Sequence, residues 1–122
     1  MAYDPNNVFA RILRGEIPCK KVYEDEHALA FHDINPQTPV HVLVIPKGHY
    51  VSFDDFSEKA SEAEIAGWVR AIGKVARDLG LPDAGYRVLS NLGEAAHQEV
   101  PHLHMHLFGG TDLGRMIKPP EK

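Results

Sequence analysis

The sequence predicts an α+β fold, with an antiparallel sheet of about five strands, one short helix and one long helix. Stretches rich in β-branched and aromatic residues recur between polar turns, which is typical of strands. One long segment instead repeats its apolar residues at helical spacing. Because the expected strands mostly follow one another, rather than alternating with helices, the sheet is expected to be antiparallel. The long helix would cover one face and leave the other free for a site.

The first half of the chain is expected to hold one short helix and three strands. Asn6 or Asn7 can cap a helix that runs from Val8 to about Arg14 and ends at Gly15. Two prolines place residues 35–39 in a loop. The strands, each bounded by polar or proline-containing turns, are expected at residues 21–24, 28–32 and 40–45.

The second half contains the strongest helix signal. Ser61 and Glu64 fit a capping box, and apolar residues from Ile65 to Leu79 then form a single stripe. We expect this helix to end near Gly80. Residues 50–59 are expected to be irregular. Further strands are expected at residues 86–91 and 102–108, with a loop at 92–99 between them and an extended C-terminal tail at 111–122.

Composition narrows the class of protein. A chain of 122 residues predicts a single domain spanning residues 1–122. The formal net charge of −4 argues against nucleic acid as a partner, because binding to its backbone needs a basic surface. Cys19 is the only cysteine, which favours a reducing compartment. No secretory signal is visible and the longest aliphatic run covers only residues 42–45, so we expect a cytoplasmic protein without a membrane partner.

Three histidines alternate near the C-terminus, at His102, His104 and His106. In a strand these side chains would share one face, while the aliphatic residues between them would line the other. Neutral imidazole serves as a nucleophile and as an acid or base near neutral pH. A row of three would allow one ring to attack while its neighbours stabilise an anionic transition state.

Two other interpretations of this row stay open. Three histidines and a water form a known catalytic zinc set. Same-face positions on a strand are about 6.6–6.8 Å apart, so three ligands from one strand converge poorly on one ion. His41 or Glu99 would have to complete such a site. The remaining alternative is a polar sheet face that happens to be rich in histidine.

The stretch from Gln98 to Gly110 resembles the signature of the histidine-triad family of nucleotide hydrolases and transferases. That signature is His-x-His-x-His, with a glutamine four positions before the first histidine. Residues 30–37 and 40–47 resemble the nucleoside-binding half of the family, and residues 8–18 its N-terminal segment. Gly109-Gly110 is similar to the purine nucleoside phosphoramidase branch, and residues 109–116 resemble the bacterial members of that branch. The dinucleoside polyphosphate hydrolase branch typically has Pro-Arg there.

The resemblance implies a fold, a reaction and catalytic residues. The fold would be the HIT-like α+β fold. The enzyme would cleave purine nucleoside phosphoramidates or acyl-nucleotides, such as AMP-lysine, at the α-phosphate and release a nucleoside monophosphate. His104 would form a covalent nucleotidyl-histidine, flanked by His102 and His106, which would contact phosphate oxygens. His41 would complete the network. No metal or other cofactor would be required, and the ligand would be a purine nucleotide such as AMP or GMP.

The resemblance also implies a nucleotide-binding pocket. The carboxylate of Asp33 would accept hydrogen bonds from ribose hydroxyls, and Asn91 would bind near the phosphate. Backbone N–H groups around Glu99 and Val100 would donate to phosphate, and apolar side chains would enclose the purine. The implied set is Phe9, Ile12, Phe31, His32, Asp33, Ile34, Asn91, Gln98, Glu99 and Val100. Taken without the resemblance, its apolar members would be ordinary core residues and Asp33 and Asn91 turn formers.

Two positions depart from the family pattern. Glu99 stands where many relatives have a serine, and a carboxylate does not donate a hydrogen bond unless it is protonated. Pro101 replaces a common tyrosine and, lacking an N–H, is expected to be the first residue of the histidine strand. The divergent tail leaves the leaving group open.

The resemblance further implies a homodimer that pairs through the long helix and a neighbouring strand, so that one sheet extends across both protomers. Trp68 is then a candidate interface residue, with core packing as the alternative.

Two other functions stay open beside the phosphoramidase: a dinucleoside polyphosphate hydrolase on the same fold, and a nucleotide-binding interaction or regulatory protein.

Overall fold

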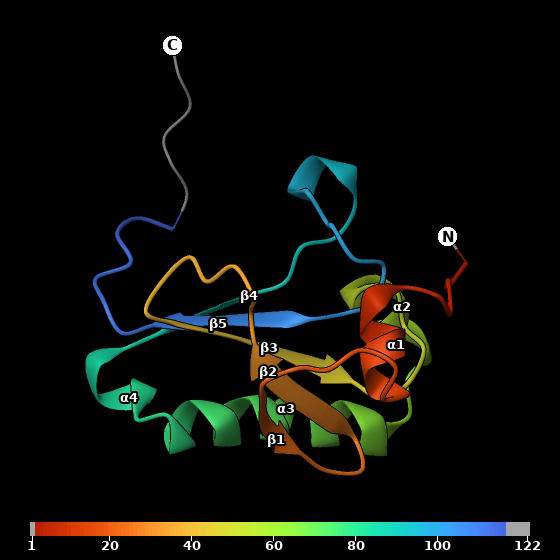
Figure 1. The fold of residues 1–122 in the computed structure, drawn as a ribbon, viewed down its shortest axis with the longest axis horizontal. Coiled ribbons are helices and arrows are strands. Elements are labelled where there is room, and N and C mark those ends of the chain that lie inside the picture. The colour runs from red at the N-terminus through yellow and green to blue at the C-terminus, as the bar shows by residue number, and fades with distance from the viewer. Residues whose placement is uncertain (1, 117–122) are drawn as a thin grey trace.

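The protein forms a five-stranded antiparallel sheet with helices packed against it (Figure 1). The structure, a computed structural model, describes residues 2–116. Neighbouring strands follow the order β1-β2-β3-β5-β4, which confirms the predicted fold class. The strands are β1 (Lys21–Glu24), β2 (Ala28–His32), β3 (Val40–Pro46), β4 (Arg87–Leu89) and β5 (Met105–Gly109).

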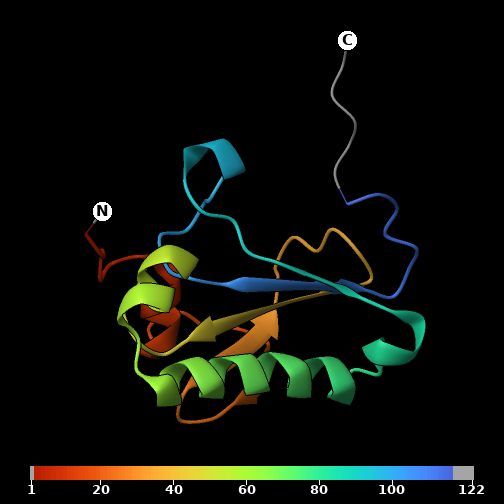
Figure 2. The ribbon, with the colours of Figure 1, turned by 180° about the vertical axis from the view of Figure 1, so that it is seen from behind.

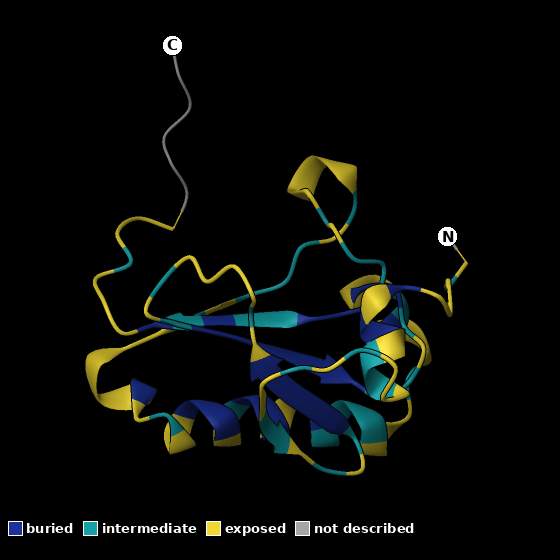
Figure 3. Ribbon diagram, viewed as in Figure 1, coloured by how far each residue is buried: buried dark blue, intermediate teal, exposed yellow. Residues whose placement is uncertain are grey.

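Helix α3 (Glu62–Asp78) lies along one face of the sheet, as Figure 2 shows, and begins at the predicted capping box of Ser61 and Glu64. Its inward stripe packs against alternate residues of the central strands, while its outward side is exposed (Figure 3). Trp68 is only 1% exposed, and its indole N–H donates to the Val44 carbonyl at 3.2 Å. Trp68 is therefore a core residue of its own chain, and the prediction that it forms an interface is wrong.

Helix α1 (Val8–Leu13) covers part of the opposite face. The Asn7 side chain accepts from the backbone N–H of Ala10, which confirms one of the two predicted caps. Strand side chains that alternate with those facing α3 form a second core cluster with Phe9 of α1: Leu29, Phe31, Leu43 and Ile45. Because α1 covers only part of this face, the rest of the sheet surface stays available for polar side chains.

The prediction that residues 50–59 are irregular is wrong, since helix α2 (Phe53–Lys59) lies there. Ser52 and Asp55 form a capping box, and two acidic residues in the first turn favour the helix N-terminus. Phe56 is the only buried residue of α2, so no apolar periodicity reveals the helix. A short helix α4 (Leu81–Ala84) and a 3₁₀ turn at Glu94–Ala96 also lie where no helix was predicted.

The last two strands are shorter than predicted. The strand predicted at residues 86–91 is confined to β4, and β5 begins only at Met105, so His102 and His104 precede it. Leu103 N–H donates to the carbonyl of Tyr50 instead of to a strand neighbour. Pro101 is consequently not the first residue of the strand. The predicted tail shows no helix or strand over residues 111–116, and its remainder lies outside the described residues. Among residues 2–116, no helix is long and apolar enough to cross a bilayer.

Candidate active site

Four histidines gather on the sheet face opposite α3. His41 lies in β3 and His106 in β5, while His102 and His104 lie in the segment that leads into β5. Leu103 and Leu107 point into the core beneath α3, so the alternation predicted from the sequence holds even where the chain is not a regular strand. The His106 ring centroid lies 5.0 Å from that of His104 and 5.2 Å from that of His41.

Hydrogen bonds assign the protons of the first two triad histidines. The Nε2 atom of His102 lies 2.9 Å from the carbonyl oxygen of Pro46, which only accepts, so Nε2 carries the proton. His104 Nδ1 lies 2.7 Å from the carbonyl oxygen of His102 and carries its proton for the same reason. In its neutral form His104 therefore has its lone pair on Nε2, which is the atom suited to nucleophilic attack.

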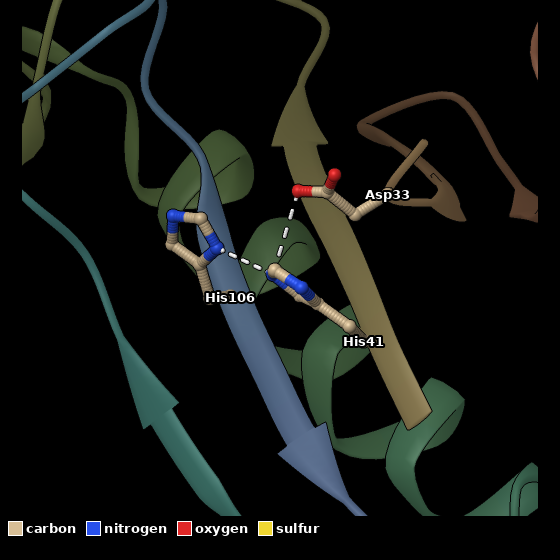
Figure 4. A group of neighbouring side chains, drawn as sticks. All are labelled: Asp33, His41 and His106. Atoms are coloured by element: carbon tan, nitrogen blue, oxygen red, sulfur yellow. Dashed lines mark hydrogen bonds and ion pairs between the residues drawn. The ribbon is translucent and has the colours of Figure 1, made fainter. Parts of the chain in front are cut away.

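A second chain of hydrogen bonds sets the protons of His41 and His106. The backbone N–H of Gln37 donates to His41 Nδ1 at 3.1 Å, so the proton of neutral His41 is on Nε2. That atom lies 2.9 Å from His106 Nδ1 and 3.5 Å from the Asp33 carboxylate (Figure 4). His106 Nδ1 thus accepts, and its Nε2 proton is the donor that His106 can offer to a ligand.

All four imidazoles are held in the neutral form. Burial lowers the pKa of His102 to about 4. Burial, together with the neighbouring His104 and His41, lowers the pKa of His106 to about 4. The pKa values of His41 and His104 are also lowered by burial, against an opposing effect of the Asp33 charge. Near neutral pH the site therefore offers uncharged nitrogen bases.

Asp33, His41 and His106 form the group of described side chains best placed to hold a cation, with ligand atoms all within 4.8 Å of one another. The ligand atoms of His102 and His104 do not belong to this group. A zinc ion would have to displace the proton shared by His41 and His106, since a metal ligand needs a free lone pair. The absence of a metal requirement stays a prediction.

Two open hollows are each lined by one member of the hydrogen-bonded His41–His106 pair. One, of about 740 Å³, is lined by His32, Asp33 and Ile34 together with His41. The other, of about 550 Å³, is lined by His106 and Asn91 among others. Ile34 is 92% exposed and therefore does not contribute to the core, which leaves its side chain free to contact a ligand. Six of the predicted site residues thus line these two hollows.

The predicted apolar residues of the pocket are placed differently. Phe9 and Phe31 are buried in the second core cluster, and Ile12 packs against it. The Phe9 ring meets the His104 ring edge-on, with centroids 5.0 Å apart, so it supports His104 from the core side. All three side chains belong to or pack on the second core cluster, which agrees with the core alternative stated for them. Contact with a purine stays a prediction.

Gln98 organises the loop in front of the triad. Its side-chain amide donates to the carbonyls of Val51 and Val100 and accepts from Gly93 N–H, so its hydrogen-bonding groups are used within the protein. Glu99 is exposed beside it. In the part of the chain that the structure describes, no hydrogen bond engages the backbone N–H of Glu99 or Val100, which are the donors predicted for phosphate.

Sequence reasoning missed several groups that hold the triad. The Tyr3 hydroxyl lies 2.6 Å from His102 Nδ1, and the Ser90 hydroxyl donates to the His104 carbonyl at 2.8 Å. Both ring nitrogens of His102 are hydrogen-bonded within the protein and are not free to contact phosphate. The expectation that His102 contacts phosphate oxygens is therefore not supported by this arrangement. Tyr3 precedes His102 by 99 positions, and no spacing pattern links the two.

Comparison with known proteins shows the family of this chain. A family model described as the HIT domain matches residues 14–113. An HIT-like protein of 13.2 kDa from Azospirillum brasilense is 73% identical over 115 residues, which are 94% of each chain. The purine nucleoside phosphoramidase of Escherichia coli K12 is 39% identical over 110 residues, covering 90% of this chain and 92% of that protein.

Solved structures share the fold over nearly the whole chain. A histidine triad protein from Clostridium difficile matches with a TM-score of 0.83 and 40% identity, covering 93% of this chain and 98% of that one. An HIT family hydrolase from Clostridium thermocellum matches with a TM-score of 0.81 and 44% identity, covering 93% and 97%. By its sequence, its fold and its row of histidines, this chain belongs to the histidine-triad (HIT) family.

Proposed function

We propose that this protein is a nucleotidyl hydrolase that cleaves purine nucleoside phosphoramidates or acyl-nucleotides at the α-phosphate. The observation that carries the proposal is the proton arrangement of the triad. His104 keeps its Nδ1 proton on the His102 carbonyl and therefore presents the lone pair of Nε2. His106 presents an Nε2 proton beside it, which suits a negatively charged phosphoryl oxygen.

In the proposed reaction His104 Nε2 attacks the α-phosphorus and the phosphorus–nitrogen bond breaks. The amine leaves with the bonding electron pair and takes a proton from water. A second water then attacks phosphorus, releases the nucleoside monophosphate, gives up a proton and restores His104. His106, neutral and with its Nδ1 already bonded to His41, stabilises the phosphoryl oxygens by a hydrogen bond rather than by transferring a proton.

The two hollows support a division of the substrate. Asp33 and Ile34 line the larger hollow, where a carboxylate next to an exposed apolar side chain suits a ribose and its purine. Asn91 lines the hollow on the side of His106, where we place the phosphate and the leaving group. The Escherichia coli relative is itself a purine nucleoside phosphoramidase, which supports this substrate class over a dinucleoside polyphosphate.

The proposal includes a homodimer and a cytoplasmic location, with AMP or GMP as ligand and neither a metal nor another cofactor. In the described residues, β4 pairs only with β5 and so forms an edge of the sheet. Val88 on β4 and Val69 on α3 are 44% and 56% exposed. An edge strand and an exposed apolar helix position are surfaces that a second copy can cover.

The proposal is tested by comparing turnover of adenosine phosphoramidate with that of a diadenosine polyphosphate. We expect the phosphoramidate to be the better substrate. His104→Ala should lose at least about 10³-fold in kcat, because the nucleophile is gone. His27→Gln is the matched control, since His27 lies in the turn between β1 and β2 and should leave kcat unchanged.

Preferred cleavage of the polyphosphate would instead assign the protein to the dinucleoside polyphosphate hydrolases. A protein that binds AMP but turns over neither substrate would be a nucleotide-binding interaction protein. Activity lost with a chelator and restored by zinc would contradict the mechanism without a metal.

A further inference from the structure

Tyr3 joins the N-terminal segment to the first histidine of the triad. Its hydroxyl oxygen lies 2.6 Å from His102 Nδ1, and the two rings meet at 66° with centroids 5.5 Å apart. Tyr3 precedes α1, far from the triad in the sequence, and no role in the reaction has been assigned to it. The contact therefore ties the start of the chain to the segment that carries the nucleophile.

The direction of this hydrogen bond follows from the other side of the ring. His102 Nε2 gives its proton to the carbonyl of Pro46 at 2.9 Å, so the neutral ring has its lone pair on Nδ1. The Tyr3 hydroxyl must then be the donor. With His102 fully buried, the ring is fixed from two opposite sides by groups of the protein.

Such fixing matters because His102 lies outside the regular sheet. Strand β5 begins at Met105, so residues 102–104 lack the ladder of hydrogen bonds that fixes a strand. Leu103 N–H is bonded to Tyr50, and the His102 carbonyl receives the Nδ1 proton of His104. The His102 carbonyl thus holds the Nδ1 proton of His104, which leaves the lone pair on Nε2.

We propose that Tyr3 is a positioning residue for catalysis. By donating to His102 Nδ1 it fixes the His102 ring, and through the His102 carbonyl it fixes the tautomer and orientation of the attacking His104. Tyr3 touches neither substrate nor reacting atoms. This role rests on the proposed hydrolase function for its effect on rate, but the hydrogen bond itself can be tested independently.

The ring and the hydroxyl of Tyr3 make separate contacts. The ring stacks on His49, with centroids 4.5 Å apart and planes 7° apart, while the hydroxyl reaches His102. Tyr3→Phe removes only the hydroxyl, and His49→Ala removes only the stacking partner. Tyr23→Phe is the matched control, because the Tyr23 hydroxyl donates to Asp25 at 2.7 Å, at β1 and away from the triad.

The experiment measures two properties of each variant of the whole protein. Long-range ¹⁵N NMR at neutral pH reports the tautomers of His102 and His104, and steady-state kinetics with adenosine phosphoramidate reports kcat and KM. In Tyr3→Phe we expect the His102 Nδ1 resonance to move toward the value of an unbonded nitrogen. We also expect kcat to fall about threefold to tenfold with KM within about twofold, as the loss of one hydrogen bond permits. Tyr23→Phe should change neither property, and His49→Ala should retain the His102 Nδ1 resonance.

An unchanged His102 Nδ1 resonance in Tyr3→Phe would overturn the hydrogen bond. A shifted resonance with unchanged kcat would overturn the positioning role. Should the wild-type protein hydrolyse no nucleotide substrate, the proposed function fails, and the NMR measurement still decides whether Tyr3 sets the state of His102.

Discussion

The two ends of the triad hold the same type of side chain in contrasting surroundings. His102 is fully buried in an irregular segment, and both of its ring nitrogens are bonded within the protein. His106 is half-buried in a regular strand, uses Nδ1 to accept from His41, and faces an open hollow. The histidine row is therefore not a uniform surface. His102 is held on both sides next to His104, the proposed nucleophile, whereas His106 can meet a ligand.

The largest expected effect is on the free energy of unfolding when His102 and His106 are replaced in turn. We expect His102→Ala to lower the free energy of unfolding by about 3 kcal/mol, because it opens a cavity and leaves the Pro46 carbonyl and Tyr3 hydroxyl unpaired. His106→Ala should cost about 1 kcal/mol, since its site is open to water. Urea denaturation measures both. Equal losses for the two variants would show that burial does not separate their roles.

The stability of the protein should fall as the pH is lowered through the weakly acidic range. The pKa of His102 drops from an ordinary 6.5 to about 4 in the folded state, so between these values the unfolded chain binds the extra proton. The stabilisation is complete above pH 6.5 and is lost as the pH falls toward 4.

From pH 7 to pH 5 we expect His102 alone to cost about 2 kcal/mol. Urea denaturation at the two values checks this, with NMR titration of the His102 ring as a second measurement. Two results together would contradict the proposed effect of burial on His102. These are a free energy of unfolding that stays constant between pH 7 and pH 5, and an NMR titration of the His102 ring with an ordinary pKa.

A smaller effect is expected at the ligand-facing end. In the wild-type protein the Asn35 N–H donates to the Asp33 carboxylate at 2.8 Å. Asp33→Asn keeps an oxygen that can accept this bond but removes the charge proposed to bind ribose. We expect KM for adenosine phosphoramidate to rise about tenfold with little change in kcat. A substrate without ribose hydroxyls separates the causes. If Asp33→Asn raises the KM of that substrate equally, Asp33 does not act through the ribose.

The sequence was enough to predict the sheet and the long helix, because each has a strong periodic pattern. Four of the five strands and α3 lie close to their predicted positions, and the Ser61 capping box is present. Helix α2 was missed because it buries a single residue, Phe56, and therefore shows no apolar stripe. The periodicity of apolar residues predicts a helix or strand well only when that element buries a full face.

The site was predictable in its members but not in its connections. Alternation placed the histidines on one face, and the resemblance added Asp33 and His41, which the fold brings to His106. The irregular path of His102 and His104 could not be predicted, because it depends on the distant carbonyl of Pro46 and on Tyr3. Such long-range hydrogen bonds arise from the packing of α1 and β3 beside the triad and leave no spacing in the sequence.

In the proposed mechanism His104 attacks through Nε2 while His102 and His106 support it. Rapid-quench mass spectrometry of the wild-type protein with adenosine phosphoramidate tests it directly. We predict a transient adenylyl group on the peptide that contains His104, formed before AMP is released and absent in His104→Ala. Full turnover with no adduct, or an adduct on His102 or His106, would show that His104 is not the nucleophile.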